Sequence, residues 1–111
     1  MEQSAISLIE QGITRRIGRR NAITNKAIQA AMKERGYDLS FADVCDAIQE
    51  LRLKRKLFIC GDQSGYYMAE TTYEREAWLK SLKARIDKQL LVFTTMNAEH
   101  GRRARQAQME L

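Results

Sequence analysis

The stretch that decides the fold is residues 23–55, ITNKAIQAAMKERGYDLSFADVCDAIQELRLKR. Apolar residues recur at helical spacing in both of its halves, which predicts one helix over residues 25–35 and another over residues 40–55. Only a few residues separate the two helices. This arrangement is typical of a helix-turn-helix.

The ends of both helices carry recognisable signals. Thr24 is suited to the N-cap of the first helix, and Gly36 follows its last turn as a C-terminal glycine does. Ser40 and Asp43 stand three residues apart, like a capping box in which Asp replaces Glu. These signals support two separate helices rather than one long helix.

The segments on either side of the two helices predict a further helix, a short strand and a hairpin. Before the helices, residues 3–12 predict another helix and residues 21–23 a very short strand. After them, the apolar runs LFIC (57–60) and YYMA (66–69) flank the loop GDQSG (61–65), which predicts a β-hairpin. The order of helix, strand, two helices and hairpin predicts a mainly α fold with a small β-hairpin, a winged helix-turn-helix.

The pattern resembles a known group of proteins. NAIT, then SFADVCDAIQELR, LFIC and SGYYMAET are similar to segments of the small winged helix-turn-helix proteins of phages and prophages that carry a long C-terminal helix. The resemblance covers roughly residues 6–95, and its most specific part is SGYYMA at residues 64–69. It implies a DNA-binding protein that serves a bacteriophage in transcription regulation or an accessory role.

The C-terminal part predicts a long helix over residues 71–100. We expect residues 1–70 to form the winged-helix domain and residues 101–111 a basic, flexible tail. The helix could pack back on its own domain, but its apolar stripe is longer than that requires and favours a homodimer by coiled-coil pairing, parallel or antiparallel. The residues expected at this contact are Leu82, Ile86, Leu90, Phe93 and Met96.

Bulk properties narrow the class further. The formal net charge is +5, which favours a polyanionic partner. The sequence shows no signal peptide and no apolar run long enough for a membrane span, so we expect a protein of the bacterial host cytoplasm with no membrane partner. Cys45 and Cys60 are expected to be free thiols there. No catalytic, metal or cofactor motif is apparent, and we expect neither an enzyme nor a bound cofactor.

Basic residues supply the candidate contacts to double-stranded DNA. Four arginines lie in a basic segment, residues 14–20, which we expect to act as a flexible arm that grips phosphates. The helix 40–55 is expected to add a few contacts at its start and along its outer face. The predicted contact residues are Arg15, Arg16, Arg19, Arg20, Lys26, Ser40, Gln49 and Arg52.

The acids on the helix 40–55 favour an alternative. Asp43, Asp46 and Glu50 would repel phosphates, and the predicted hairpin loop carries no Lys or Arg. A winged-helix module that docks a host or phage protein through this acidic helix is therefore the second hypothesis. RNA binding is a third, disfavoured because no aromatic platform for stacking bases is evident.

Overall fold

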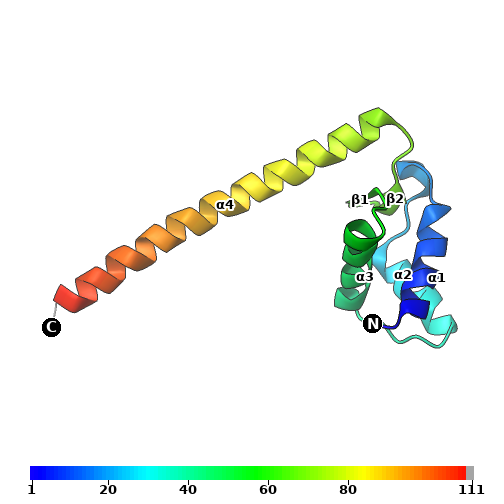
Figure 1. Cartoon of the computed structure of the whole chain (residues 1–111), viewed down its shortest axis with the longest axis horizontal. Helices are drawn as coiled ribbons and strands as arrows, with labels where there is room; N and C mark the ends of the chain where they lie inside the picture. Colours follow the sequence, from blue (N-terminus) through cyan, green and yellow to red (C-terminus); the bar gives the residue numbers. More distant parts are fainter. Residues whose placement is uncertain (110–111) are drawn as a thin grey trace. The chain divides into compact units, whose positions relative to one another are not determined.

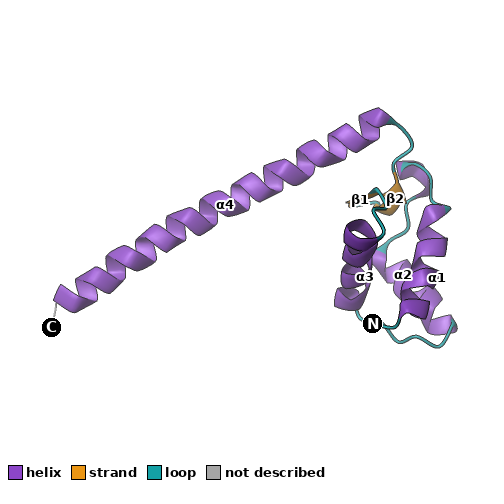
Figure 2. Cartoon of the chain, viewed as in Figure 1, coloured by secondary structure: helices purple, strands orange, loops and turns teal. Residues whose placement is uncertain are grey.

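The structure, a computed structural model, describes residues 1–109 and contains four α-helices, one short 3₁₀ helix and one hairpin in the described range (Figures 1 and 2). Its contacts divide the chain into a compact unit, residues 1–78, and a second unit from Leu79 onward. The compact unit therefore extends beyond the expected boundary at residue 70. Its elements are α1 (Gln3–Thr14), η1 (Arg19–Asn21), α2 (Asn25–Glu34), α3 (Phe41–Lys54), β1 (Ile59–Asp62) and β2 (Gly65–Met68).

The predicted cap and C-terminal glycine of α2 are confirmed. Thr24 Oγ1 accepts a hydrogen bond from the Ala27 amide at 3.1 Å, so Thr24 caps α2. Gly36 has a φ of +89°, and the next amide, that of Tyr37, donates to the Met32 carbonyl at 3.0 Å. This bonding ends α2 in a Schellman-type turn, which requires the left-handed backbone that glycine adopts without strain.

The hairpin is confirmed, with a shorter loop than expected. Antiparallel pairing runs from Ile59 opposite Met68 to Asp62 opposite Gly65, so the loop has two residues instead of five. The predicted strand at residues 21–23 is wrong in extent, because Asn21 belongs to η1 and only Ile23 forms a bridge, to Tyr66. A second bridge joins Ile17 to Met68, so β2 has bridges on one edge and β1 on the other. The compact unit thus has the helix order and hairpin wing of a winged helix-turn-helix.

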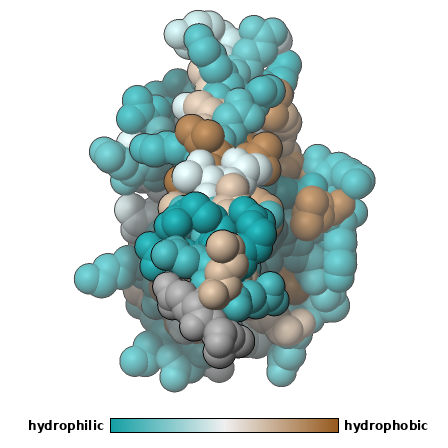
Figure 3. All heavy atoms as spheres, turned by 90° about the vertical axis from the view of Figure 1, so that its left-hand side faces the viewer, coloured by the Kyte–Doolittle hydropathy of each residue, from teal (hydrophilic) through white to brown (hydrophobic). Residues whose placement is uncertain are grey.

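The long C-terminal helix, α4 (Thr72–Met109), continues well past its predicted end at residue 100. The expectation of a flexible tail over residues 101–111 is therefore wrong for residues 101–109, which continue the helix, and its last two residues lie outside the described range. Gly101 does not stop the helix, because a single interior glycine weakens a helix by only about 1 kcal/mol. Hydrophilic side chains surround the C-terminal turns of α4, which face the viewer in Figure 3.

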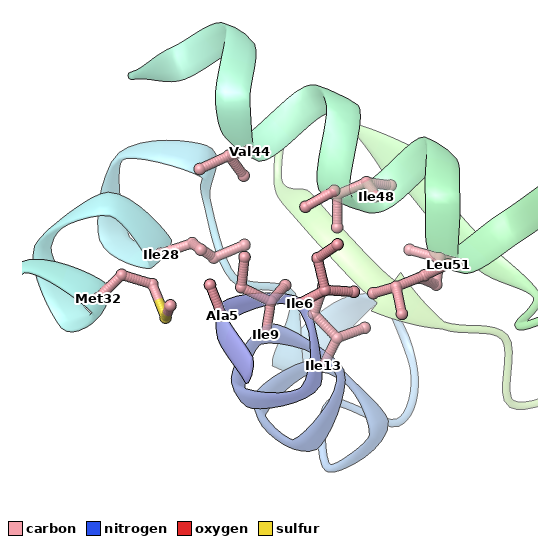
Figure 4. Close-up of a cluster of buried hydrophobic side chains, with 11 residues drawn as sticks. Ala5, Ile6, Ile9, Ile13, Ile28, Met32, Val44, Ile48 and Leu51 are labelled. Atoms are coloured by element: carbon pink, nitrogen blue, oxygen red, sulfur yellow. The ribbon is translucent and has the colours of Figure 1, made fainter. Parts of the chain in front are cut away.

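One apolar core holds the compact unit together. α3 buries Val44, Ala47, Ile48 and Leu51, and α2 buries Ile28 and Met32, whereas Ala27 and Ala31 of α2 are exposed. α1 contributes a full stripe, and the side chains of the three helices converge between them (Figure 4). The buried cluster is Ala5, Ile6, Ile9, Ile13, Ile28, Met32, Val44, Ala47, Ile48, Leu51 and Ile59.

Candidate nucleic-acid interface

The arginine segment is ordered, which corrects the expectation of a flexible arm. The Gly18 amide donates to the Met68 carbonyl at 2.9 Å, and the Met68 amide donates to the Arg16 carbonyl at 2.7 Å. The Asn21 side chain donates to the Ile17 carbonyl at 2.8 Å. Backbone bonds to β2 therefore fix this segment against the wing, because β2 offers its free edge there.

Two of the four arginines are engaged with acids of the same unit. Arg19 Nε lies 2.8 Å from Asp62 Oδ2, at the end of β1. Arg20 donates two hydrogen bonds to Glu70, at 2.8 and 3.2 Å. This pairing holds the pKa of the Glu70 carboxyl below its usual value, because the carboxylate accepts those bonds. Sequence reasoning missed both partners: Asp62 lies 43 residues after Arg19, and Glu70 lies 50 residues after Arg20.

The other two arginines remain available. Arg15 and Arg16 are exposed and take part in no ion pair with any residue that the structure describes. The one side-chain contact recorded for Arg16 is a long hydrogen bond of 3.5 Å to the Asn21 carbonyl. Lys26 is likewise exposed, in the first turn of α2. These three cations can approach a phosphate without first breaking an ion pair.

The wing receives its basic charge from outside its own strands. The loop residues Gln63 and Ser64 are exposed and uncharged, and Asp62 beside them is acidic. The pair of Arg19 with Asp62 brings a guanidinium to the tip of the hairpin. The guanidinium offsets the carboxylate of Asp62, so this pair gives the tip of the hairpin no net charge.

The predicted contact residues of α3 differ in their surroundings. Ser40 caps the helix: its hydroxyl accepts from the Asp43 amide at 3.1 Å, and Asp43 accepts from the Ser40 amide at 2.9 Å. These bonds hold the pKa of the Asp43 carboxyl below its usual value. Gln49 is exposed on the outer face, close to the exposed carboxylate of Asp46 one turn earlier.

Arg52 makes contacts within the fold instead of facing a groove of DNA. Its Nε donates to the Ile59 carbonyl at 2.9 Å, and its guanidinium lies 4.9 Å from the ring centroid of Trp78. Trp78 also meets Phe58 edge-on, with ring centroids 5.7 Å apart. Arg52 thus ties α3 to the hairpin and to the first turns of α4 through a cation–π contact. Its side chain is not displayed for base reading, unlike that of Gln49.

A polar network that the sequence did not reveal joins α2, α3 and the wing. The buried amide of Asn25 donates to the Phe41 carbonyl at 3.2 Å and to the Tyr66 hydroxyl at 3.3 Å, and accepts from Gln29 at 2.8 Å. Burial raises the pKa of the Tyr66 hydroxyl. Asn25 gave no signal in the sequence, because its partners become neighbours only in the folded chain.

An acidic groove lies beside the N-terminal half of α3. This groove, of about 440 Å³, has an apolar floor that includes Ala5, Ile6 and Leu39. Five carboxylates line it, and hydrogen bonding from Lys54 holds the pKa of Glu50 below its usual value. The five acids are Glu2, Asp38, Asp43, Asp46 and Glu50.

Comparison with family models, with curated proteins and with solved structures found no match to this chain. Within residues 1–109 no helix is both long and apolar enough to cross a membrane. The same range holds no group of three His, Cys, Asp or Glu side chains placed to bind a metal ion. The interpretation of the site therefore depends on its own geometry.

Proposed function

We propose that this chain is a DNA-binding protein of a phage or prophage, regulatory or accessory in role, which contacts mainly the phosphate backbone of duplex DNA. The observation that carries the proposal is the fixed position of the arginine segment against the wing of a winged helix-turn-helix. Arg15 and Arg16 offer guanidinium groups there that no acid of the described chain neutralises. Guanidinium groups bind phosphate oxygens strongly, with displacement of counterions from the DNA.

We further propose that the protein works as a homodimer in the cytoplasm of the bacterial host. The stripe on α4 supports the dimer, because Ile86, Leu90, Phe93 and Met96 are each more than half exposed. Leu82 is the one half-buried residue of the predicted contact set. The cytoplasmic location is supported by Cys45 and Cys60, which are both free thiols.

The test is a gel-shift titration of a mixed-sequence duplex with the wild type and with Arg15→Gln/Arg16→Gln. The variant removes two cations that have no acidic partner, so we expect its affinity to fall about tenfold or more at low salt. Lys33→Gln/Arg35→Gln is the matched control, since it removes the same charge from exposed positions outside the segment, and neither side chain forms an ion pair with any residue from 1 to 109. Equal losses of affinity in both variants would show that only the net charge of the protein matters for duplex binding. That result would contradict a binding site at the arginine segment.

The acidic groove favours a second function, the docking of a basic and partly apolar segment of a host or phage protein. Five carboxylates around an apolar floor are complementary to such a segment and repel a phosphate backbone. Asp46→Asn separates the two functions, because Asp46 lies next to Gln49 on the outer face of α3. If α3 lies against DNA, the variant binds the duplex several times more tightly, whereas a groove reserved for protein leaves the duplex affinity unchanged.

A further inference from the structure

The excess positive charge of the chain is concentrated outside the compact unit. Residues 1–78 contain twelve Lys and Arg against eleven Asp and Glu, a net charge of +1. Residues 79–111 contain seven Lys and Arg against three Asp and Glu, a net charge of +4. A polyanion is therefore attracted more strongly by the long helix than by the winged-helix unit as a whole.

The ion pairs increase this difference in available positive charge between the compact unit and α4. In the compact unit Arg19, Arg20, Lys54 and Arg55 each face a carboxylate. On α4, Lys83 pairs with Asp87, and two arginines share the single carboxylate of Glu99. Within the described range, the remaining cations of α4 beyond residue 79 form no ion pair. These cations are Lys80, Arg85, Lys88 and Arg105.

The geometry of a helix places these cations away from the apolar stripe. At 3.6 residues per turn, Leu79, Leu82, Ile86, Leu90 and Phe93 follow one face, and Met96 lies at the edge of that face on the side of Arg85. Lys88 lies on the opposite face, and Lys80, Arg85 and Arg105 lie on its two flanks. The row extends about 37 Å along the axis, from Lys80 to Arg105, at 1.5 Å per residue. Pairing through the stripe would leave this basic face exposed in both protomers.

We propose that this basic face of α4, the residues Lys80, Arg85, Lys88 and Arg105, is a second binding surface for the phosphate backbone of duplex DNA. The inference rests on the proposed function and adds a site to the arginine segment. Lys88 lies opposite the apolar stripe, so a helix that buried the stripe in a lipid surface would point Lys88 away from the head groups, whereas a helix pair that buries the stripe leaves all four cations open to a polyanion. That geometry favours a nucleic acid over an anionic membrane.

The experiment compares the salt dependence of duplex binding by fluorescence anisotropy for the full-length wild type and for Lys80→Gln/Lys88→Gln/Arg85→Gln/Arg105→Gln. Gln preserves helix propensity, and circular dichroism checks that α4 remains helical. We expect the slope of log K against log salt to become less steep by about 2 to 4 and the affinity to fall about tenfold or more, since each lost phosphate contact changes the slope by about 0.9. The matched control is Lys33→Gln/Arg35→Gln/Lys54→Gln/Lys56→Gln, which removes the same charge from the compact unit and is expected to change the slope by less.

The outcomes separate the inference from the function on which it rests. An unchanged slope in the α4 variant, with a slope flattened by Arg15→Gln/Arg16→Gln, would overturn the inference and leave DNA binding intact. A wild type that fails to bind the duplex at low salt would overturn both. A parallel titration uses vesicles of phosphatidylcholine with phosphatidylserine. Binding to the vesicles that depends on the α4 cations, without binding to the duplex, would assign this face to a membrane and contradict the proposal.

Discussion

Gly65 shows how one residue can secure the wing. It opens β2 with a φ of +120°, and a Cβ atom there would collide with the carbonyl of Ile23. The Tyr66 amide and the Ile23 carbonyl bond at 2.8 Å in the same place, so the approach of the two backbones needs a residue without a side chain. The wing and the segment before α2 thus depend on this glycine.

Substitution of Gly65 by alanine is expected to lower the free energy of unfolding by about 2 kcal/mol or more, because it adds both backbone strain and a collision. Urea denaturation followed by tryptophan fluorescence measures the change. Gly12→Ala is the matched control: no heavy atom lies within 4 Å of its added Cβ, and the residue is helical. Alanine there should raise stability by up to about 1 kcal/mol. Equal effects of the two substitutions would contradict the account of the wing.

Asp43, at the start of α3, makes the stability of the fold depend on pH. Its hydrogen bonds with Ser40 hold its pKa below the usual value, so the folded state binds a proton less readily than the unfolded state. A carboxyl with a lowered folded pKa contributes stability that is fully present above its unfolded pKa, about 3.9 for Asp, and is lost as the pH falls through the folded pKa.

The pH prediction is a urea midpoint that falls as the pH is lowered from 5 toward 3, with a smaller fall in Asp43→Asn than in the wild type; these pH limits are about one unit either side of the unfolded value. The pKa of Glu70 is also lowered, by its hydrogen bonds from Arg20. The Asp43→Asn variant therefore keeps part of the fall in stability at low pH. Asp38→Asn is the matched control, because the Asp38 side chain is exposed and forms no hydrogen bond or ion pair with any residue from 1 to 109. If Asp38→Asn and Asp43→Asn reduce the fall of the urea midpoint equally, the capping box does not cause the pH dependence of stability.

At the scale of elements, the sequence predicts the features that depend on neighbouring residues, such as helix caps. The caps of α2 and α3 follow from Thr24, Gly36 and Ser40, because capping involves residues within one turn. The strand expected at residues 21–23 was largely wrong, because a strand is completed by distant partners, here Tyr66 and Met68. The expectation of a flexible arginine arm is wrong for the same reason, because Asp62 in the hairpin and Glu70 just after it bind Arg19 and Arg20.

The candidate site was predicted in part. Residue type alone singles out the arginines, Lys26 and Gln49; they are exposed in the structure, and their contact with DNA stays a prediction. Arg52 was chosen on its charge, but its contacts with Ile59 and Trp78 depend on tertiary packing that the sequence does not display. The network of Asn25 was missed entirely for the same reason.

The apolar stripe of α4 supports a prediction about assembly. Ile86→Gln/Phe93→Gln removes two exposed apolar residues from the stripe, so we expect a shift from dimer to monomer in sedimentation velocity. Leu91→Gln/Val92→Gln is the matched control, because these residues are equally exposed but lie off the stripe. A wild type that sediments as a monomer at micromolar concentration, or a control that dissociates as readily as the stripe variant, would contradict the proposed contact.

At the scale of the whole molecule, the proposed binding to DNA depends on how charge is distributed along the chain. The compact unit is nearly neutral: five of its eleven acids line the groove beside α3, and Arg15 and Arg16, between α1 and the wing, form no ion pair with residues 1–109. The long helix carries most of the excess positive charge. A protein with this distribution is expected to bind through phosphates first and to gain little from base contacts at α3.

The most direct test of the central claim is the affinity of the wild-type chain for a mixed-sequence duplex across a salt series. We predict binding at about 50 mM salt that weakens steeply as salt rises, with a log–log slope of about −3 or steeper, because several phosphates are neutralised in each complex. Absence of binding at that salt concentration, or a slope near zero, would contradict phosphate-backbone recognition and leave the acidic groove as the functional surface.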